Sequence, residues 1–388
     1  MRSAVLFCRV IDNFGDIGVC WRLARLLQHA YGWQVSIWVD DLASFARLCP
    51  GLDVQASHQA YESIQVVHWC DQMPAAEWRQ LQANLLIEGF GCRLPDAALE
   101  RIAQLRPHWI NLEYLSAESW VESCHGLRSP DAQTGLSKYF FFPGFSAKTG
   151  GVLYEPGLDA ERRAFRRQAA LRTQFVQSLH LPLPVQQALD DPAYLKVLMF
   201  CYPQSGLSAL IQAWQEGAQE LLCLLPQGVA TAQAQAFLGG EAQAGAWRRQ
   251  GNLTLAILPF VPQARFDRLL WLADMAFVRG EDSFVRAQLA GLPLVWQIYP
   301  QEADAHLEKL EAFMQAYLAR LQPPAAHALQ ALWQVWNQPE HYAGLGAAWR
   351  QLQASLPQLH RHALRWRQRL RRNGDLAGNL LQFIQKIG

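Results

Sequence analysis

Short apolar segments alternate with longer helical stretches along most of this chain, in two successive blocks. The apolar segments of the first block cover residues 5–10, 35–39, 64–69, 84–88 and 109–112. Those of the second block cover residues 195–202, 221–225, 253–261, 275–278 and 294–298. Strands that alternate with helices form βαβ units, which build a parallel sheet covered on both faces. The pattern therefore predicts an α/β protein with two Rossmann-like domains that face each other across a cleft.

The boundary between the two blocks is predicted from proline placement. A Gln/Arg-rich helix is expected at residues 160–179, and two prolines at residues 182 and 184 prevent it from continuing. We therefore predict an N-terminal Rossmann-like domain at residues 1–185, a C-terminal one at 193–355 and a helical segment at 356–388. The helix expected at residues 352–370 is basic. Leu364, Trp366 and Leu370 suggest a packing stripe on it, which favours a solvated helix face over a nucleic-acid site.

Composition narrows the functional classes. Lys and Arg number 34 against 33 Asp and Glu, so the net charge of +1 argues against a protein that holds nucleic acid by bulk charge. The 51% of hydrophobic residues excludes a largely disordered chain. Without a membrane-length apolar run or a signal peptide, the protein is expected to be soluble and cytoplasmic. The eight cysteines form no C-x-x-C pair, so they are interpreted as reduced, mostly buried small hydrophobes.

Two carboxylates follow the first expected strand. Asp12 and Asp16 lie four residues apart in a loop that also contains Gly15 and Gly18, which permit unusual backbone conformations. Ordinary turn and helix-capping roles account for such aspartates equally well. The loop is not G-x-G-x-x-G, and the chain has no G-x-x-x-x-G-K-[ST] motif. Dinucleotide-dehydrogenase and P-loop functions are therefore disfavoured.

A second polar stretch follows the strand expected at residues 275–278 and begins a helix. Ser283 and neighbouring backbone amides are expected at the helix N-terminus, where a phosphate is favoured, and Arg279 adds a forked cation. Glu281 and Asp282 repel phosphate, which suggests hydroxyl groups beside it. A nucleotide-sugar offers both groups, although an acidic capping turn is the competing interpretation.

Aromatic residues end two strands of the second block. Phe200 and Tyr202 end the first, and Phe260 ends another just before Gln263 and Phe266. Such rings can sandwich a flat base whose edge Gln263 reads, although most phenylalanines in a chain like this one are core residues.

Taken together, these segments resemble the EarP family, the arginine rhamnosyltransferases that modify elongation factor P. The strings that carry the resemblance are FCRVIDNFGDIGVCWRLAR at residues 7–25, NLEYLSAE at 111–118, FPGF at 142–145, RGEDSF at 279–284 and WQIYPQ at 296–301. The resemblance implies a GT-B fold, dTDP-β-L-rhamnose as donor and one arginine of elongation factor P as acceptor. It also implies an inverting reaction without a metal or other cofactor, which activates the factor that relieves ribosome stalling at polyproline.

The resemblance also implies roles for individual residues. Asp16 would be the general base and Asp12 its partner around the guanidinium, with Phe14 and Gly15 in the same substrate-binding loop. Glu281 would be an essential donor-site carboxylate. The nucleotide pocket would comprise Phe200, Phe260, Phe266 and, at the thymine, Gln263. The diphosphate contacts would come from Tyr202, Arg279 and Ser283, and a further polar contact to the donor from Asp282.

The implied chemistry agrees with these residue types. A guanidinium is a poor nucleophile, and two carboxylates can align it and take a proton as the C–N bond forms. Two alternatives stay open: a GT-B glycosyltransferase with another nucleotide-sugar or acceptor, and a non-catalytic nucleotide-binding module.

Overall fold

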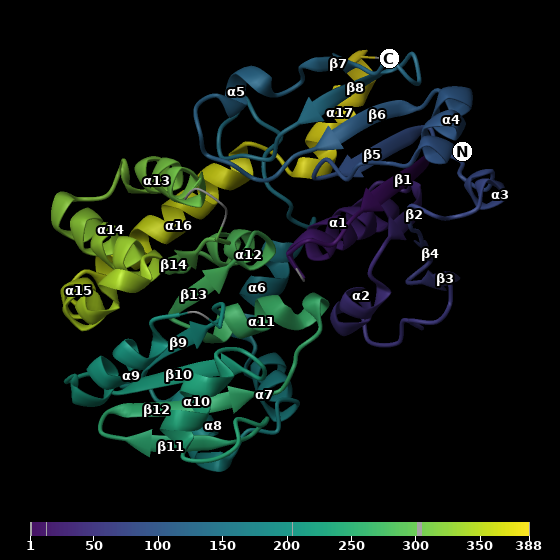
Figure 1. The fold of residues 1–388 in the computed structure, drawn as a ribbon. Helices are drawn as coiled ribbons and strands as arrows, with labels where there is room; N and C mark the ends of the chain where they lie inside the picture. The colour runs from purple at the N-terminus through teal and green to yellow at the C-terminus, as the bar shows by residue number, and fades with distance from the viewer. Residues whose placement is uncertain (1, 13, 204, 301–304, 388) are drawn as a thin grey trace. The chain divides into compact units, whose positions relative to one another are not determined.

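The structure is a computed structural model that describes residues 2–12, 14–203, 205–300 and 305–387. The chain forms two compact units, residues 1–156 with 370–388 and residues 157–369 (Figure 1). The first unit thus includes the C-terminal end of the chain. The expected N-terminal domain ran to residue 185, whereas residues 157–185 lie in the second unit.

The first unit is built on a mixed, mainly parallel sheet (Figure 1, purple to blue). In spatial order its strands are β3 (His58–Tyr61), β4 (Ile64–His68), β2 (Gln34–Val39), β1 (Ser3–Cys8), β5 (Leu85–Gly89), β6 (His108–Leu112), β8 (Ser137–Phe141) and β7 (Arg128–Pro130). Its helices are α1 (Gly15–Arg25), which continues as a π-helical turn at Leu26–Ala30, α2 (Leu42–Leu48), α3 (Ala75–Trp78), α4 (Asp96–Leu105), α5 (Val121–Cys124) and α17 (Leu376–Ile387).

Strand β1 is buried on both faces. Ala4, Leu6 and Cys8 belong to one hydrophobic cluster, whereas Val5 and Phe7 belong to the other. This alternation follows from the two-residue side-chain period of a strand, and burial on both faces is the reason that β1 is an almost unbroken apolar run. The first cluster takes in α1 and α17, and the second contains Trp38, Trp69 and Trp78.

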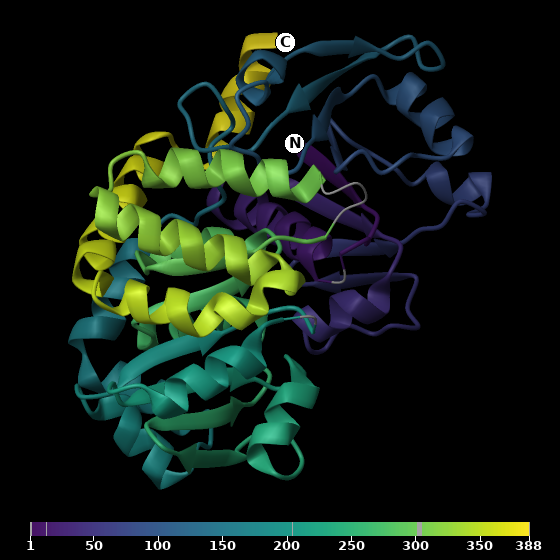
Figure 2. The same cartoon turned by 60° about the vertical axis from the view of Figure 1, so that its left-hand side comes forward.

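The second unit contains another sheet of the same type. In spatial order its strands are β11 (Trp247–Gln250), β12 (Leu253–Leu258), β10 (Leu221–Pro226), β9 (Leu195–Met199), β13 (Met275–Arg279) and β14 (Leu294–Gln297). Its helices are α6 (Leu158–Arg167), α7 (Ala169–Gln177), α8 (Leu183–Asp190), α9 (Leu207–Glu216), α10 (Thr231–Leu238), α11 (Gln263–Leu272), α12 (Asp282–Ala290), α13 (Ala305–Leu318), α14 (Pro323–Asn337), a 3-10 helix at Pro339–Gly344, α15 (Leu345–Gln353) and α16 (Leu356–Arg372), in which the chain leaves this unit. Helices α13, α14 and α15 lie side by side (Figure 2).

Two expectations about individual elements need correction. The single helix expected at residues 160–179 is two helices, α6 and α7, because Gln168 between them has extended backbone angles of −97° and 101°. Leu364 is exposed, so it does not belong to a packing stripe with the buried Trp366. The cysteines are mostly buried, as expected: six are buried, Cys124 is half-buried and Cys70 is exposed. None of the helices among the described residues has the length and apolar character that crossing a bilayer requires.

Candidate functional site

Each sheet reverses its strand order beside its first strand, and ligands of such sheets bind at the carboxyl ends of the strands there. In the first unit the reversal lies between β1 and β5, which pair in parallel, with β2 on the other side of β1. In the second unit it lies between β9 and β13, with β10 on the other side of β9. The loops after these strands contain most of the residues that the sequence singled out.

Asp16 lies at the reversal point of the first unit, in the first turn of α1, and only 2% of it is exposed. Its Oδ2 accepts hydrogen bonds from the backbone N–H groups of Ile11 (2.8 Å) and Asp12 (2.9 Å). The preceding loop is also held at Val10, whose N–H donates to Asp40 Oδ1 at 2.9 Å. The Asp16 carboxylate is therefore fixed by the loop that precedes it.

A tyrosine from another loop contacts the second oxygen of this carboxylate. Tyr114, which follows β6, donates its hydroxyl to Asp16 Oδ1 at 3.2 Å. Phe90, which follows β5, stacks on the Tyr114 ring with a centroid distance of 4.3 Å. The sequence analysis did not single out either residue. Tyr114 stands in the NLEYLSAE string that carried the resemblance, which is the signal that was available.

Asp12 and Gly15 are in close contact within the same loop. The N–H of Gly15 donates to the Asp12 carbonyl, and a Cβ added at Gly15 would lie 2.6 Å from Asp12 Oδ2. Only glycine therefore leaves the Asp12 carboxylate where it is. Phe14 is half-buried and precedes the first residue of α1, whereas Asn13 of the same string lies outside the described residues.

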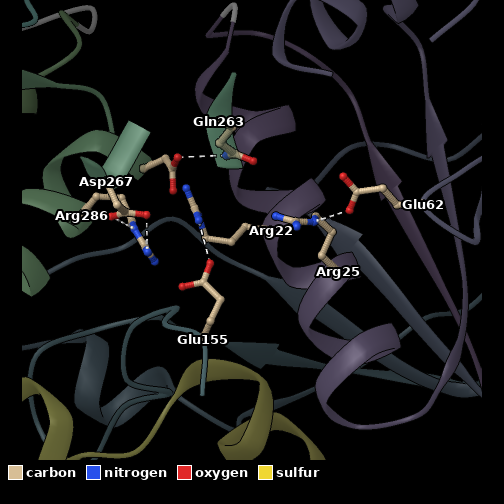
Figure 3. Close-up of polar contacts among 8 residues, drawn as sticks. Arg22, Arg25, Glu62, Glu155, Gln263, Asp267 and Arg286 are labelled. Atoms are coloured by element: carbon tan, nitrogen blue, oxygen red, sulfur yellow. Dashed lines mark hydrogen bonds and ion pairs between the residues drawn. The ribbon is translucent and has the colours of Figure 1, made fainter. Parts of the chain in front are cut away.

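Helix α1 is itself anchored by a buried cation. Arg22 is 2% exposed, and its Nη1 donates to Glu155 Oε1 at 2.7 Å, whereas the nearby Arg25 pairs with Glu62 at a more exposed position (Figure 3). The Arg22–Glu155 pair ties α1 to the segment after β8, which restrains the helix that holds Asp16.

At the reversal point of the second unit, Arg279 lies between two aromatic rings. Its guanidinium carbon is 4.5 Å from the Phe200 ring centroid and 5.0 Å from that of Tyr202, and Nη1 donates to the Cys201 carbonyl at 3.0 Å. Phe266 packs against Phe200, with 5.4 Å between the two ring centroids. Four of the predicted nucleotide and diphosphate residues, Phe200, Tyr202, Phe266 and Arg279, thus form one cluster at the ends of β9 and β13.

Ser283 is hydrogen-bonded within its own turn, whereas Phe260 is exposed. The Ser283 hydroxyl donates to the Arg279 carbonyl at 2.6 Å and accepts the Arg279 N–H at 3.1 Å, so it closes the turn before α12. Phe260 is 48% exposed at the end of the β12 segment, which leaves its ring available to a ligand.

The N-termini of α11 and α12 are connected by polar side chains. Gln263 Nε2 donates to Asp282 Oδ2 at 2.9 Å, so the first residues of the two helices touch. One turn further along each helix, Arg286 donates to both carboxylate oxygens of Asp267 at 2.8 and 2.6 Å (Figure 3). This bidentate buried ion pair fixes α11 against α12, and it therefore also fixes Gln263 relative to Asp282.

Glu281 is half-buried and lies directly before α12. The preceding Gly280 has a φ of +57°, and its carbonyl accepts the indole N–H of Trp296 at 2.7 Å. The turn therefore lets α12 begin three residues after the carboxyl end of β13. Such a helix end favours an anion, and Glu281 adds an acceptor for a hydroxyl group beside it.

The structure thus gathers the predicted residues into two clusters, one in each unit. Asp12, Phe14, Gly15 and Asp16 form the first. The residues of the second are Phe200, Tyr202, Gln263, Phe266, Arg279, Glu281, Asp282 and Ser283, and the exposed Phe260 lies three positions before Gln263 in the chain. Within the described parts of the chain, no group of three or more His, Cys, Asp and Glu side chains is arranged to hold a metal ion. Of the strings that carried the resemblance, Asn13 and Gln301 are the two positions outside the described residues.

Comparison with known proteins identifies relatives along the whole chain. The model of the family described as Elongation-Factor P (EF-P) rhamnosyltransferase EarP matches residues 5–385. A protein-arginine rhamnosyltransferase of Pseudomonas putida is 45% identical over 383 residues, which cover 98% of each chain. That of Pseudomonas aeruginosa is 41% identical over 387 residues, 99% of each chain.

Comparison with solved structures gives the same family. A structure described as the structural basis for EarP-mediated arginine glycosylation of translation elongation factor EF-P matches with a TM-score of 0.67 and 34% identity, over 100% of this chain and 99% of that one. Acinetobacter baumannii MurG matches with a TM-score of 0.54 and 13% identity over the whole of both chains, which shows the fold alone. The predicted GT-B fold class, with two Rossmann-like α/β domains, is confirmed.

Proposed function

The chain belongs to the EarP family of elongation factor P rhamnosyltransferases, and we propose that it moves rhamnose from dTDP-β-L-rhamnose to one arginine of elongation factor P. It is a glycosyltransferase whose reaction is the glycosylation of a protein arginine. The match of the family over residues 5–385 is the observation that carries this function. Because elongation factor P acts in translation, we place the enzyme in the cytoplasm.

The first unit is the site for the acceptor arginine. A guanidinium is flat, cationic and rich in N–H donors, so carboxylates on adjacent positions of its edge can bind it. Asp12 and Asp16 supply such carboxylates at the reversal point of the sheet, and Gly15 leaves room for Asp12 to keep its position. The fixed orientation of Asp16 supports its assignment as the group that takes the proton.

The second unit is the site for the donor. Phe200, Phe260 and Phe266 present aromatic surface to the base, and Gln263 reads the thymine edge. Tyr202 and Arg279 contact the diphosphate, together with backbone N–H groups at the start of α12. Because the Ser283 hydroxyl is engaged with the Arg279 backbone, Ser283 contributes through its position at this helix end. Asp282 and Glu281 accept hydrogen bonds from donor hydroxyl groups.

The reaction is a direct displacement. A guanidinium nitrogen attacks the anomeric carbon of rhamnose, the bond from that carbon to the diphosphate oxygen breaks, and dTDP leaves with the electron pair. Asp16 takes one N–H proton, so the product remains a singly charged guanidinium. Attack from the face opposite the leaving group inverts the anomeric centre. Arg279 and the N-terminus of α12 stabilise the charge that builds up on the diphosphate, and we propose that no metal takes part.

Intact mass spectrometry of elongation factor P, incubated with this protein and dTDP-rhamnose, tests the proposal. One added deoxyhexose on one arginine is expected. A parallel screen that measures nucleoside diphosphate release from other nucleotide-sugars distinguishes the alternative of a different donor. No turnover with any donor would indicate a non-catalytic binding module, and loss of transfer in the presence of EDTA would contradict metal independence.

A further inference from the structure

Two aromatic residues of the first unit, Tyr114 and Phe90, connect Asp16 to the loops that follow β6 and β5. The Tyr114 hydroxyl donates to Asp16 Oδ1 at 3.2 Å, and the Tyr114 ring stacks on Phe90 with an interplanar angle of 13°. We infer that Tyr114 is a positioning residue that fixes the Asp16 carboxylate to take a proton from the attacking guanidinium, and that Phe90 holds the Tyr114 ring in place. This inference rests on the proposed function.

The hydrogen bonds of Asp16 show why Tyr114 matters. Oδ2 is already held by the N–H groups of Ile11 and Asp12, which lie in the same loop and move with it. The bond from Tyr114 to Oδ1 comes from a residue 98 positions away along the chain. It therefore restrains Oδ1 as well, whereas the two loop bonds hold Oδ2.

The backbone at Phe90 is in a conformation that bulky residues rarely adopt. Its φ is +56°, that of Gly91 is +63°, and the Cys92 N–H donates to the Gly89 carbonyl at 3.1 Å, which closes a tight turn after β5. A non-glycine residue persists there only where its surroundings determine its conformation, and such residues gather at functional sites. At Phe90 the left-handed turn is what directs the ring onto Tyr114.

The same turn is tied to the strand that leads to Tyr114. The Phe90 N–H donates to the Leu112 carbonyl at 2.7 Å, and the Gly91 N–H donates to Asn111 Oδ1 at 3.2 Å. Leu112 is the last residue of β6, two positions before Tyr114. Because both ring-bearing segments are hydrogen-bonded to each other, the stack is rigid, and the Tyr114 hydroxyl has a defined place beside Asp16.

The first test compares Tyr114→Phe with the wild-type enzyme in transfer of rhamnose to elongation factor P. Loss of a hydrogen bond to a charged group is expected to lower kcat ~10- to 100-fold. The KM for dTDP-rhamnose and the thermal unfolding midpoint should stay unchanged, because the donor residues and the Phe90 stack are intact. In the Asp16→Asn background, Tyr114→Phe should cause no further loss.

The matched control is Tyr61→Phe, which removes a hydroxyl that donates to the Pro50 carbonyl at 3.1 Å on the edge strand β3. It should leave kcat and both KM values at wild-type levels. Unchanged kcat in Tyr114→Phe, or an equal loss in the Asp16→Asn background, would overturn the positioning role.

Phe90 is tested by a pair of variants. Phe90→Leu removes the stack and should lower kcat, whereas Phe90→Tyr keeps an aromatic ring and should restore it. A folded Phe90→Leu enzyme with wild-type kcat would remove Phe90 from the account. The proposed function fails separately: it requires transfer by the wild-type enzyme, whereas the positioning inference concerns only how the variants differ from it.

Discussion

At the scale of single residues, little space surrounds the Asp12 carboxylate. Gly15→Ala should lower kcat ~10- to 100-fold, because a Cβ 2.6 Å from Asp12 Oδ2 must displace that carboxylate, and a small misplacement is costly in catalysis. Stability should not fall, because alanine is the better helix former at the first residue of α1. Steady-state kinetics with elongation factor P as the varied substrate measures the effect.

Gly240→Ala is the control for this variant, since a Cβ at Gly240 meets no atom within 4 Å. Its kinetics should match the wild type. A wild-type kcat in Gly15→Ala would show that the position of the Asp12 carboxylate does not matter for transfer, and would contradict its role beside the guanidinium.

In the cluster of the second unit, Arg279 is the residue that we propose to contact the donor diphosphate. Arg279→Ala should weaken dTDP-rhamnose binding ~10- to 100-fold, because a charge-assisted contact to the diphosphate is lost together with the cation that spaces Phe200 from Tyr202. Isothermal calorimetry with the donor alone measures this affinity. Arg249→Ala, which breaks the Arg249–Glu220 pair of the same unit, should bind the donor normally. Equal donor affinity in Arg279→Ala and the wild type would refute the assignment.

At the scale of elements, α17 completes the core of the N-terminal unit although it is the last helix of the chain. Leu376, Leu380 and Ile384 belong to the same hydrophobic cluster as the core of β1, and the Asn379 side chain donates to the Gly150 carbonyl at 3.0 Å. Leu380→Ala should destabilise this unit by ~2–5 kcal/mol, as for other fully buried leucines. Urea unfolding measures it, and the exposed Gln382→Ala on the same helix should change stability by less than ~0.5 kcal/mol. Equal midpoints for the two variants would show that α17 is dispensable.

A histidine after α5 makes the same unit sensitive to acid. His125 Nδ1 accepts the N–H of Phe142 at 3.1 Å, and the imidazole packs on the Phe141 ring. Burial lowers the pKa of His125 below its ordinary value of about 6.5. The folded state therefore binds this proton less readily than the unfolded chain. The stabilising contribution is complete above pH ~6.5 and is lost as the pH falls below that value.

The variant His125→Gln isolates this effect, because glutamine stays neutral and keeps an acceptor for the Phe142 N–H. Urea-unfolding midpoints measured at pH 7.5 and pH 5.5 should differ more in the wild type than in the variant. An identical pH difference in both proteins would contradict the assignment.

At the scale of the whole molecule, the strand–helix alternation predicted the fold class and the central strands, because strands buried on both faces are continuous apolar runs. The edge strands β3 and β11 went unpredicted, since they are short and largely polar or exposed. The packing of α17 in the first unit was not predicted either, because it depends on contacts between residues far apart in the sequence, which a local sequence pattern does not reveal.

The same limit applies to the candidate site. The Asp12–Asp16 loop and the RGEDSF turn stand out as contiguous strings after apolar strands. The contact between Tyr114 and Asp16 joins residues 98 positions apart, and the left-handed turn at Phe90 has no sequence signature of its own. The sequence therefore predicts the loops to which we assign the chemistry, and the structure adds how the Asp16 carboxylate is held.

The most direct test of the account is rhamnosylation of elongation factor P by the Asp16→Asn variant, followed by intact mass spectrometry, with calorimetry of dTDP-rhamnose binding on the same preparation. We expect transfer to fall by at least ~100-fold, the usual contribution of a general base, while donor affinity stays near the wild-type value. Transfer at the wild-type rate by Asp16→Asn would contradict it.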